Sequence, residues 1–190
     1  MGFLDAILGR TKPVPAKLDN LFMLPGAVLT LEAGTGFRPT GTGSVCFSAA
    51  EGRAFGEIEN EVRGLLSLGS DHAPAEISQD SYHYTWVVCR HAPDDPEGLV
   101  TDLHAVNSSL ELGGFGPQLL CTLMAFRDER GASMALVYLY KRGTFYPFAP
   151  QGGQRRDNVM EMQVRSALGA DLKIEPDTGR WFPVYGAPGL

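Results

Sequence analysis

The sequence lacks the motifs by which most enzyme classes are recognised. It contains no HExxH zinc motif, no pair of CxxC motifs, no GxSxG nucleophile turn and no Walker phosphate loop. No Ser-His-Asp or Cys-His set can be read from the spacing, although the members of such a set often lie far apart in a chain. We therefore expect a protein that is not an enzyme, and the sequence indicates no catalytic residue, no cofactor and no bound metal.

Cysteine, positive charge and long apolar runs are also scarce. The three cysteines, Cys46, Cys89 and Cys121, are odd in number and far apart, which indicates reduced thiols in a cytoplasmic protein. The net charge of −6 argues against a nucleic-acid partner, because neutralising phosphates needs a basic face. No run approaches the roughly 20 apolar residues of a membrane-spanning helix. These absences exclude a general nucleic-acid binder and predict a chain that does not cross a bilayer.

The most informative stretch that is present runs from Gln118 to Phe148. Leu, Val, Tyr, Phe and Thr dominate it, and turn signals interrupt it at residues 128–131 and 141–143. Apolar runs separated by glycine-containing turns predict an antiparallel meander of three strands. Pro147, near the end of the third run, favours an edge position for that strand.

The other segments are predicted to pack around this meander. Helical spacing and capping residues predict four helices, over residues 17–23, 49–68, 96–112 and 155–168. Val159 is expected on the buried side of the last of these helices. Alternating residues and turn signals predict further strands over residues 27–32, 44–47 and 81–91, and a terminal hairpin over residues 172–185. The last residues, 186–190, are expected to fray.

This order of elements predicts the α+β class. The sheet is mainly antiparallel, the meander over residues 118–148 lies at its centre, and about four helices pack on it. The uneven alternation of helices and strands excludes a regular doubly wound parallel sheet. We expect a short amphipathic N-terminal segment with its linker over residues 1–12 and a single α+β domain over residues 13–190.

Two groups of residues suggest a site for a small ligand. The glycine-rich stretch over residues 34–43, with Arg38, resembles a phosphate loop in composition, but a strand rather than a helix follows it, so a hairpin loop is the favoured interpretation. On the predicted strand over residues 81–91, His83, Cys89 and His91 share one face. Cys89 and His91 would supply only part of the four-ligand set that structural zinc requires, so strand packing is the favoured interpretation there as well.

The N-terminal segment offers a candidate site for a partner. Phe3, Leu4, Ile7 and Leu8 would form one apolar face of a short helix, and the proline-rich linker that follows holds this helix away from the domain. A short helix of this kind needs a surface on which to dock. That surface is the chain's own core, a protein partner or the surface of a membrane.

Three stretches carry a resemblance to a known family. The opening MGFLDAILGRTKPVPAKLDNLF, the block GFRPTGTGSVCF and the ending DTGRWFPVYG resemble the actinobacterial PspA-associated proteins of the PspAB type. The resemblance covers most of the chain. It implies a role beside PspA, the coiled-coil protein of the phage-shock response to envelope stress, and it implies no enzymatic activity and no defined site residues.

Three hypotheses about function follow. The first is a non-catalytic accessory or adaptor protein that binds PspA, or another component of the membrane-stress response, through its N-terminal face. The second is a small-molecule-binding or enzymatic α+β domain that uses the glycine-rich loop or the face with His83, Cys89 and His91. The third is a cytoplasmic protein held peripherally at the inner face of the membrane by the same N-terminal segment. The sequence indicates nothing about the oligomeric state.

Overall fold

The fold is built on one antiparallel sheet of six strands, as seen in the computed structural model, which describes residues 17–48, 55–67 and 76–190. The strand order is β2-β3-β1-β4-β5-β6, and every neighbouring pair is antiparallel. The strands are β1 (Arg38–Ser48), β2 (Glu76–Gln79), β3 (Tyr84–Arg90), β4 (Leu119–Arg127), β5 (Ser133–Leu139) and β6 (Thr144–Phe148). The predicted α+β class and the predicted meander, now β4 to β6, are confirmed. The meander forms one side of the sheet rather than its centre, and β6 lies at an edge.

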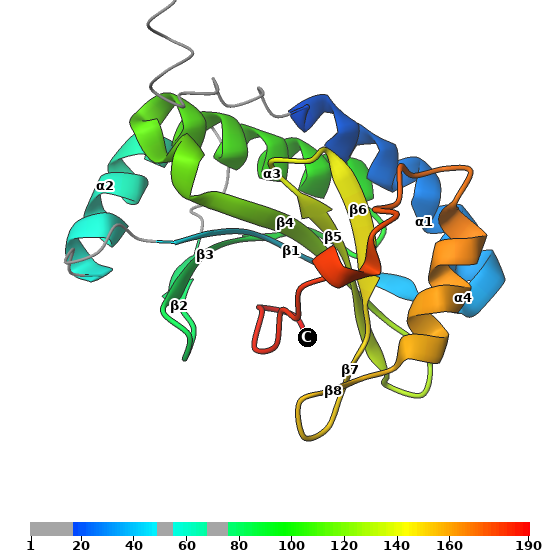
Figure 1. Ribbon diagram of the computed structural model, residues 1–190. Helices are drawn as coiled ribbons and strands as arrows, with labels where there is room; N and C mark the ends of the chain where they lie inside the picture. Colours follow the sequence, from blue (N-terminus) through cyan, green and yellow to red (C-terminus); the bar gives the residue numbers. More distant parts are fainter. Residues whose placement is uncertain (1–16, 49–54, 68–75) are drawn as a thin grey trace, which may run out of the picture.

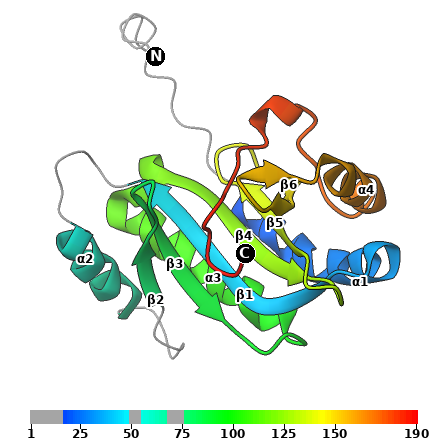
Figure 2. The same cartoon turned by 90° about the horizontal axis from the view of Figure 1, so that it is seen from below.

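Helices cover one face of this sheet (Figure 1). The α-helices are α1 (Leu24–Thr35), α2 (Phe55–Ser67), α3 (Pro96–Leu110) and α4 (Asn158–Leu168). A 3-10 turn, η1 (Leu18–Met23), leads into α1, and a π turn and a second 3-10 turn, η2 (Glu111–Phe115) and η3 (Gly116–Gln118), join α3 to β4. The C-terminal segment, drawn in red, crosses the opposite face of the sheet (Figure 2). The molecule therefore has three layers, of which the third is an irregular segment.

The alternation of side chains along the strands produces two apolar cores. Val45 and Phe47 of β1 point toward the helices and join the larger core, whereas Cys46 between them points to the opposite face. The smaller core on that opposite face includes Trp86 of β3 and Trp181 of the C-terminal segment. Because successive residues of a strand face opposite sides, a sheet with apolar residues at nearly every position must be covered on both faces.

Aspartate side chains cap the starts of two helices. Asp95 accepts a hydrogen bond from the backbone N–H of Gly98, 2.9 Å away, and Pro96 occupies the first turn of α3. Asp157 accepts a hydrogen bond from the N–H of Met160, also at 2.9 Å, so α4 begins three residues later than the sequence pattern predicts. Val159, expected to be buried on this helix, is exposed, because its spacing of five residues from Val164 places it on a different side of the helix from the buried Val164 and Leu168.

The predicted strand over residues 27–32 is wrong. These residues lie inside α1, which continues directly from η1 and carries Pro25 in its first turn. Proline is tolerated there because the first N–H groups of a helix have no intrahelical partner. Pro25 therefore lies at the beginning of a helix rather than after the end of one.

The glycine-rich stretch is not a hairpin loop. Gly36, with φ +77°, ends α1 in the left-handed conformation, and β1 begins at Arg38 and runs through the remaining glycines. Two positions within this strand require glycine. A Cβ at Gly41 would lie within 3.0 Å of the His91 carbonyl oxygen, and a Cβ at Gly43 would lie within 3.0 Å of the Leu103 side chain. The glycines therefore permit close packing and leave no loop that could hold a phosphate.

The predicted terminal hairpin and the predicted fraying are also wrong. Ile174 forms one parallel bridge with Phe145 of β6, and after it the chain makes a 3-10 turn, η4 (Thr178–Arg180), with no strand. Residues 181–190 then run across the sheet, where Trp181 and Ala187 are buried. The apolar side of this segment covers the second core, and this contact replaces the hydrogen bonds that a hairpin would supply.

Gly189 provides a test of this docking. Its φ is +92°, and a Cβ there would lie 2.9 Å from the Cβ of Ala125 and 3.1 Å from Cγ2 of Thr42. Gly189→Ala is therefore expected to lower the free energy of unfolding by about 1–2 kcal/mol, as measured by chemical denaturation. Gly152→Ala, at a site with open space around the new methyl group, serves as the control. Equal stability of the two variants would contradict a docked C-terminal segment.

Candidate functional site

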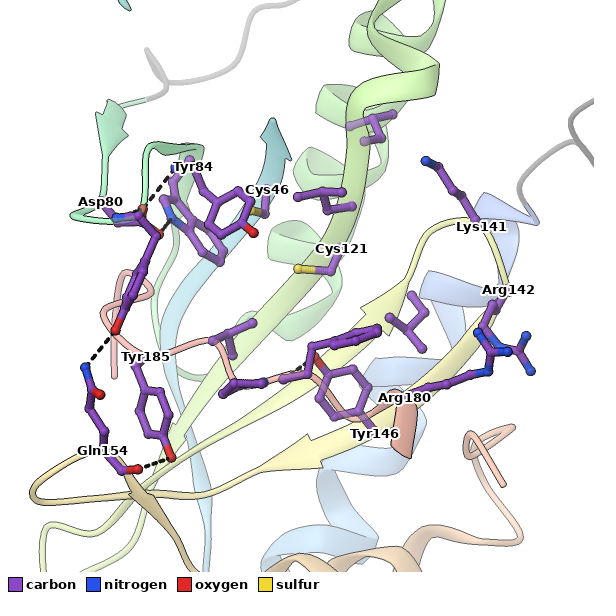
Figure 3. A pocket seen from close by; sticks show the side chains of 18 residues that line it. Cys46, Asp80, Tyr84, Cys121, Lys141, Arg142, Tyr146, Gln154, Arg180 and Tyr185 are labelled. Atoms are coloured by element: carbon purple, nitrogen blue, oxygen red, sulfur yellow. Dashed lines mark hydrogen bonds between the residues drawn. The ribbon is translucent and has the colours of Figure 1, made fainter. Parts of the chain in front are cut away.

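A half-open cavity of about 710 Å³ lies on the face of the sheet that the C-terminal segment covers only in part (Figure 3). Its volume is within the usual range for small-molecule sites. The walls come from the β2–β3 turn, the turn that joins β5 and β6, the small hairpin of β7 (Pro150–Gln151) and β8 (Arg155–Arg156), and residues 180–185. Four segments far apart in the sequence therefore meet around one space.

The floor of the cavity is apolar and belongs to the sheet. Its side chains come from β1, β3, β4, β5 and β6: Cys46, Trp86, Leu119, Leu120, Cys121, Leu139 and Tyr146. Aromatic residues of the β2–β3 turn, of the start of β3 and of the C-terminal segment add to the walls: Tyr82, Tyr84, Phe182 and Tyr185. A lining of this kind favours a ligand with a substantial apolar part.

Two thiols lie side by side in this floor. Cys46 and Cys121 are direct partners in the antiparallel pairing of β1 with β4, and both side chains point toward the cavity (Figure 3). The hydrogen bond with Cys121, together with burial, raises the pKa of Cys46 far above its ordinary value. Cys46 therefore remains a neutral thiol at physiological pH, and it contributes a small apolar surface rather than a nucleophile.

Basic side chains gather at one end of the cavity (Figure 3). Lys141 donates a hydrogen bond to the neutral carbonyl of Pro117 at 2.9 Å. Arg142 and Arg180 contact the carboxylates of Glu175 and Asp177. Three positive charges thus face two negative charges, and one positive charge remains in excess at this end.

A chain of polar contacts closes the opposite end. The Gln154 side chain donates to the hydroxyl of Tyr82 at 2.7 Å, and the hydroxyl of Tyr185 donates to the Gln154 carbonyl at 2.8 Å. Asp80 lies beside them, but it accepts hydrogen bonds from the Trp86 indole and from the backbone N–H groups of Tyr82 and Tyr84. These contacts join three wall segments and leave the Asp80 carboxylate well supplied with donors.

The residues of the predicted strand-face site do not come together. His83 lies in the turn before β3 with φ +67°, Cys89 is buried in the larger core, and His91 follows β3 at the end away from the cavity. His104, the other histidine of the described chain, packs against Phe22 in a tilted arrangement with ring centroids 4.9 Å apart. Within residues 17–48, 55–67 and 76–190, no group of three or more His, Cys, Asp or Glu side chains is placed to hold a metal.

The cavity could not be foreseen from the sequence, because its lining residues are scattered between positions 46 and 185. One signal pointed toward it: the alternation Tyr82, Tyr84, Trp86 on the predicted strand. Trp86 belongs to the smaller core, whereas Tyr84 remains 41% exposed and forms a wall of the cavity. The proposed partner-binding residues Phe3, Leu4, Ile7 and Leu8 lie outside the described residues.

The fold and the site define an α+β domain with a two-sided antiparallel sheet and a half-open apolar cavity. The chain belongs to the family described as PspA associated protein B, PspAB, whose family model matches residues 1–189. Membership associates the protein with PspA in an accessory role. No curated protein and no solved structure matches the chain. Among the helices described, none is long and apolar enough to span a membrane.

His91 lies between two carboxylates, and this arrangement predicts a pH dependence. Its Nε2 is 2.7 Å from Asp102 and its Nδ1 is 2.9 Å from Asp95, and the hydrogen bond with Asp102 is the main cause of its raised pKa. The stabilisation is fully present below the ordinary histidine pKa of about 6.5 and disappears as the pH rises through the higher pKa of the folded state.

The His91→Gln variant is therefore expected to lose more stability, relative to the parent protein, at pH 6 than at pH 9. Urea denaturation at both values measures the difference. His83→Asn, which replaces an exposed histidine in a turn, is the matched control. A deficit of the same size at both pH values would show that the His91 charge contributes nothing.

Glu175 anchors the start of the segment that walls the cavity. Its buried carboxylate accepts hydrogen bonds from Arg142 at 2.5 Å and from Thr144 at 2.7 Å. The contact with Arg142 is the main cause that lowers the pKa of Glu175 to about 2. Its stabilisation is present above the ordinary carboxyl pKa and is lost as the pH falls toward 2.

Glu175→Gln is expected to lower the free energy of unfolding at pH 7 by about 3 kcal/mol, because Arg142 loses its buried partner. The deficit should shrink as the pH is lowered from 5 to 3, as followed by urea denaturation. Glu97→Gln, on the exposed start of α3, is the control. A deficit that stays constant with pH would contradict a charged role for Glu175.

Proposed function

We propose that this protein is a non-catalytic accessory that binds PspA directly and acts with it in the response to envelope stress. The observation that carries the proposal is the match of residues 1–189 to a family defined by association with PspA. The match extends over nearly the whole chain, so the association concerns the entire protein rather than one borrowed segment.

The chemistry of the described side chains supports a binding role. Cys46 is held as a neutral thiol, and the two ring nitrogens of His91 are both engaged by carboxylates. A nucleophile requires an adjacent base or a lowered pKa, and a general base requires a free lone pair. These two groups meet neither requirement.

We propose the N-terminal segment, residues 1–12, as the part that docks on PspA. Phe3, Leu4, Ile7 and Leu8 would form an apolar face at helical spacing, which suits insertion into a groove between helices of a coiled-coil protein. Phe22 and Met23, near the start of the described chain, are 50% and 39% exposed, so the domain itself presents apolar surface that a partner could cover.

Deletion of residues 1–12 is expected to reduce the affinity for purified PspA at least tenfold, because the main apolar anchors are removed. Biolayer interferometry with immobilised PspA measures the affinity, and thermal denaturation checks that the fold is retained. Val159→Ser, which removes an exposed apolar side chain on α4, is the control and should bind as the parent does.

Two results would contradict this proposal. Equal affinity of the truncated and full-length chains would move the contact surface to the domain. Binding to phospholipid vesicles in flotation, lost on deletion of residues 1–12 and independent of PspA, would favour membrane-surface attachment by the same segment.

A further inference from the structure

We propose that the cavity on the second face of the sheet binds an amphiphile with a single negative charge: a fatty acid whose carboxylate lies at the basic end and whose chain lies along the apolar floor. This inference is independent of the association with PspA. It rests on three features of the cavity, which are its volume, its apolar floor and its uneven charge.

The floor requires an apolar occupant. Trp86 and Tyr146 are almost wholly buried in the sheet and present aromatic surface to the cavity, and the thiols of Cys46 and Cys121 lie between them. A polar molecule would leave its donors and acceptors unpaired against such a surface, which costs free energy. A hydrocarbon chain loses no hydrogen bonds there and gains free energy in proportion to the apolar surface that it removes from water.

The charge distribution fixes the orientation of the occupant. Lys141, Arg142 and Arg180 lie at one end, and the carboxylates of Glu175 and Asp177 neutralise two of their three charges. The remaining positive charge matches a single carboxylate. A dianionic head would exceed it, and a cationic head would meet repulsion from the basic cluster.

The opposite end of the cavity is less suited to the carboxylate head group than the basic end is. The Asp80 carboxylate repels an anion, and the hydroxyls of Tyr82 and Tyr185 are both engaged through Gln154. A chain end that needs no hydrogen bonds suits this end. The fatty acid is therefore oriented with its carboxylate at the basic cluster and the end of its hydrocarbon chain at the tyrosine walls.

Laurate, a fatty acid with twelve carbons, is the probe. We expect isothermal titration calorimetry of the full-length protein to show one-site binding of laurate at concentrations where it forms no micelles. Acetate, which has the head without the chain, and dodecyltrimethylammonium, which has the chain with the opposite charge, should bind at least tenfold more weakly. Laurate should also change the tryptophan fluorescence, because Trp86 lines the floor of the cavity.

Two sets of variants separate head from chain. The double variant Lys141→Gln/Arg180→Gln should weaken laurate binding at least tenfold, and Phe182→Ala, which opens an exposed wall, should weaken it by a smaller factor. Arg63→Gln, which removes an exposed positive charge from α2, is the control for net charge. Thermal denaturation of each variant verifies folding.

Three results would overturn the proposal. They are failure of laurate to bind, equal affinity for laurate and dodecyltrimethylammonium, and laurate binding that the double variant and Arg63→Gln weaken equally. None of these measurements involves PspA. A negative result for laurate would therefore not contradict the proposed association with PspA.

Discussion

The structure depends on one constraint: a sheet whose strands are apolar on both faces must be covered twice. β4 and β5 are buried at nearly every position, and their side chains divide between two cores. Helices α1, α3 and α4 cover one face in the ordinary way. Among the described residues, the other face is covered mainly by residues 175–190, so the position of this segment decides how much of the sheet remains open. The anchor is the buried Glu175, which ties the segment to Arg142 and Thr144 at the edge of the sheet. The cavity is the part of the second face that this short cover does not reach.

Much of the fold follows from local signals in the sequence. The meander was predictable because its turns carry glycine and its strands have no competing helical spacing, and α3 was predictable because Asp95 and Pro96 together define a helix start. The failures also have physical causes. Residues 27–32 alternate like a strand, but a helix that begins at Leu24 and packs on α3 and α4 prevails over that local preference. The glycines at 41 and 43 read as a loop, yet they serve close contacts of a strand with His91 and Leu103, which no local rule could reveal.

The site was less predictable than the fold, because contacts between distant parts of the chain create it. Its floor is made of residues that any reading of the sequence assigns to the core, and only the incomplete cover turns them into a cavity wall. Cys46 and Cys121 are adjacent because of the register of β1 against β4, which spacing along the chain does not encode. The candidate that the sequence did suggest, on the strand with His83, Cys89 and His91, fails because one residue leaves the strand, one enters the core and one pairs with carboxylates. A shared strand face is thus a weak guide to a shared site.

The central claim is that the protein is an accessory of PspA whose N-terminal segment makes the contact and whose domain remains intact. Hydrogen–deuterium exchange of the full chain, alone and with saturating PspA, tests this claim most directly, because it locates the contact without any mutation. The account predicts slower exchange in the complex over residues 1–12, extending to residues 18–23, with the sheet unchanged. Slower exchange confined to residues 175–190 and the walls of the cavity, or no change anywhere, would contradict it.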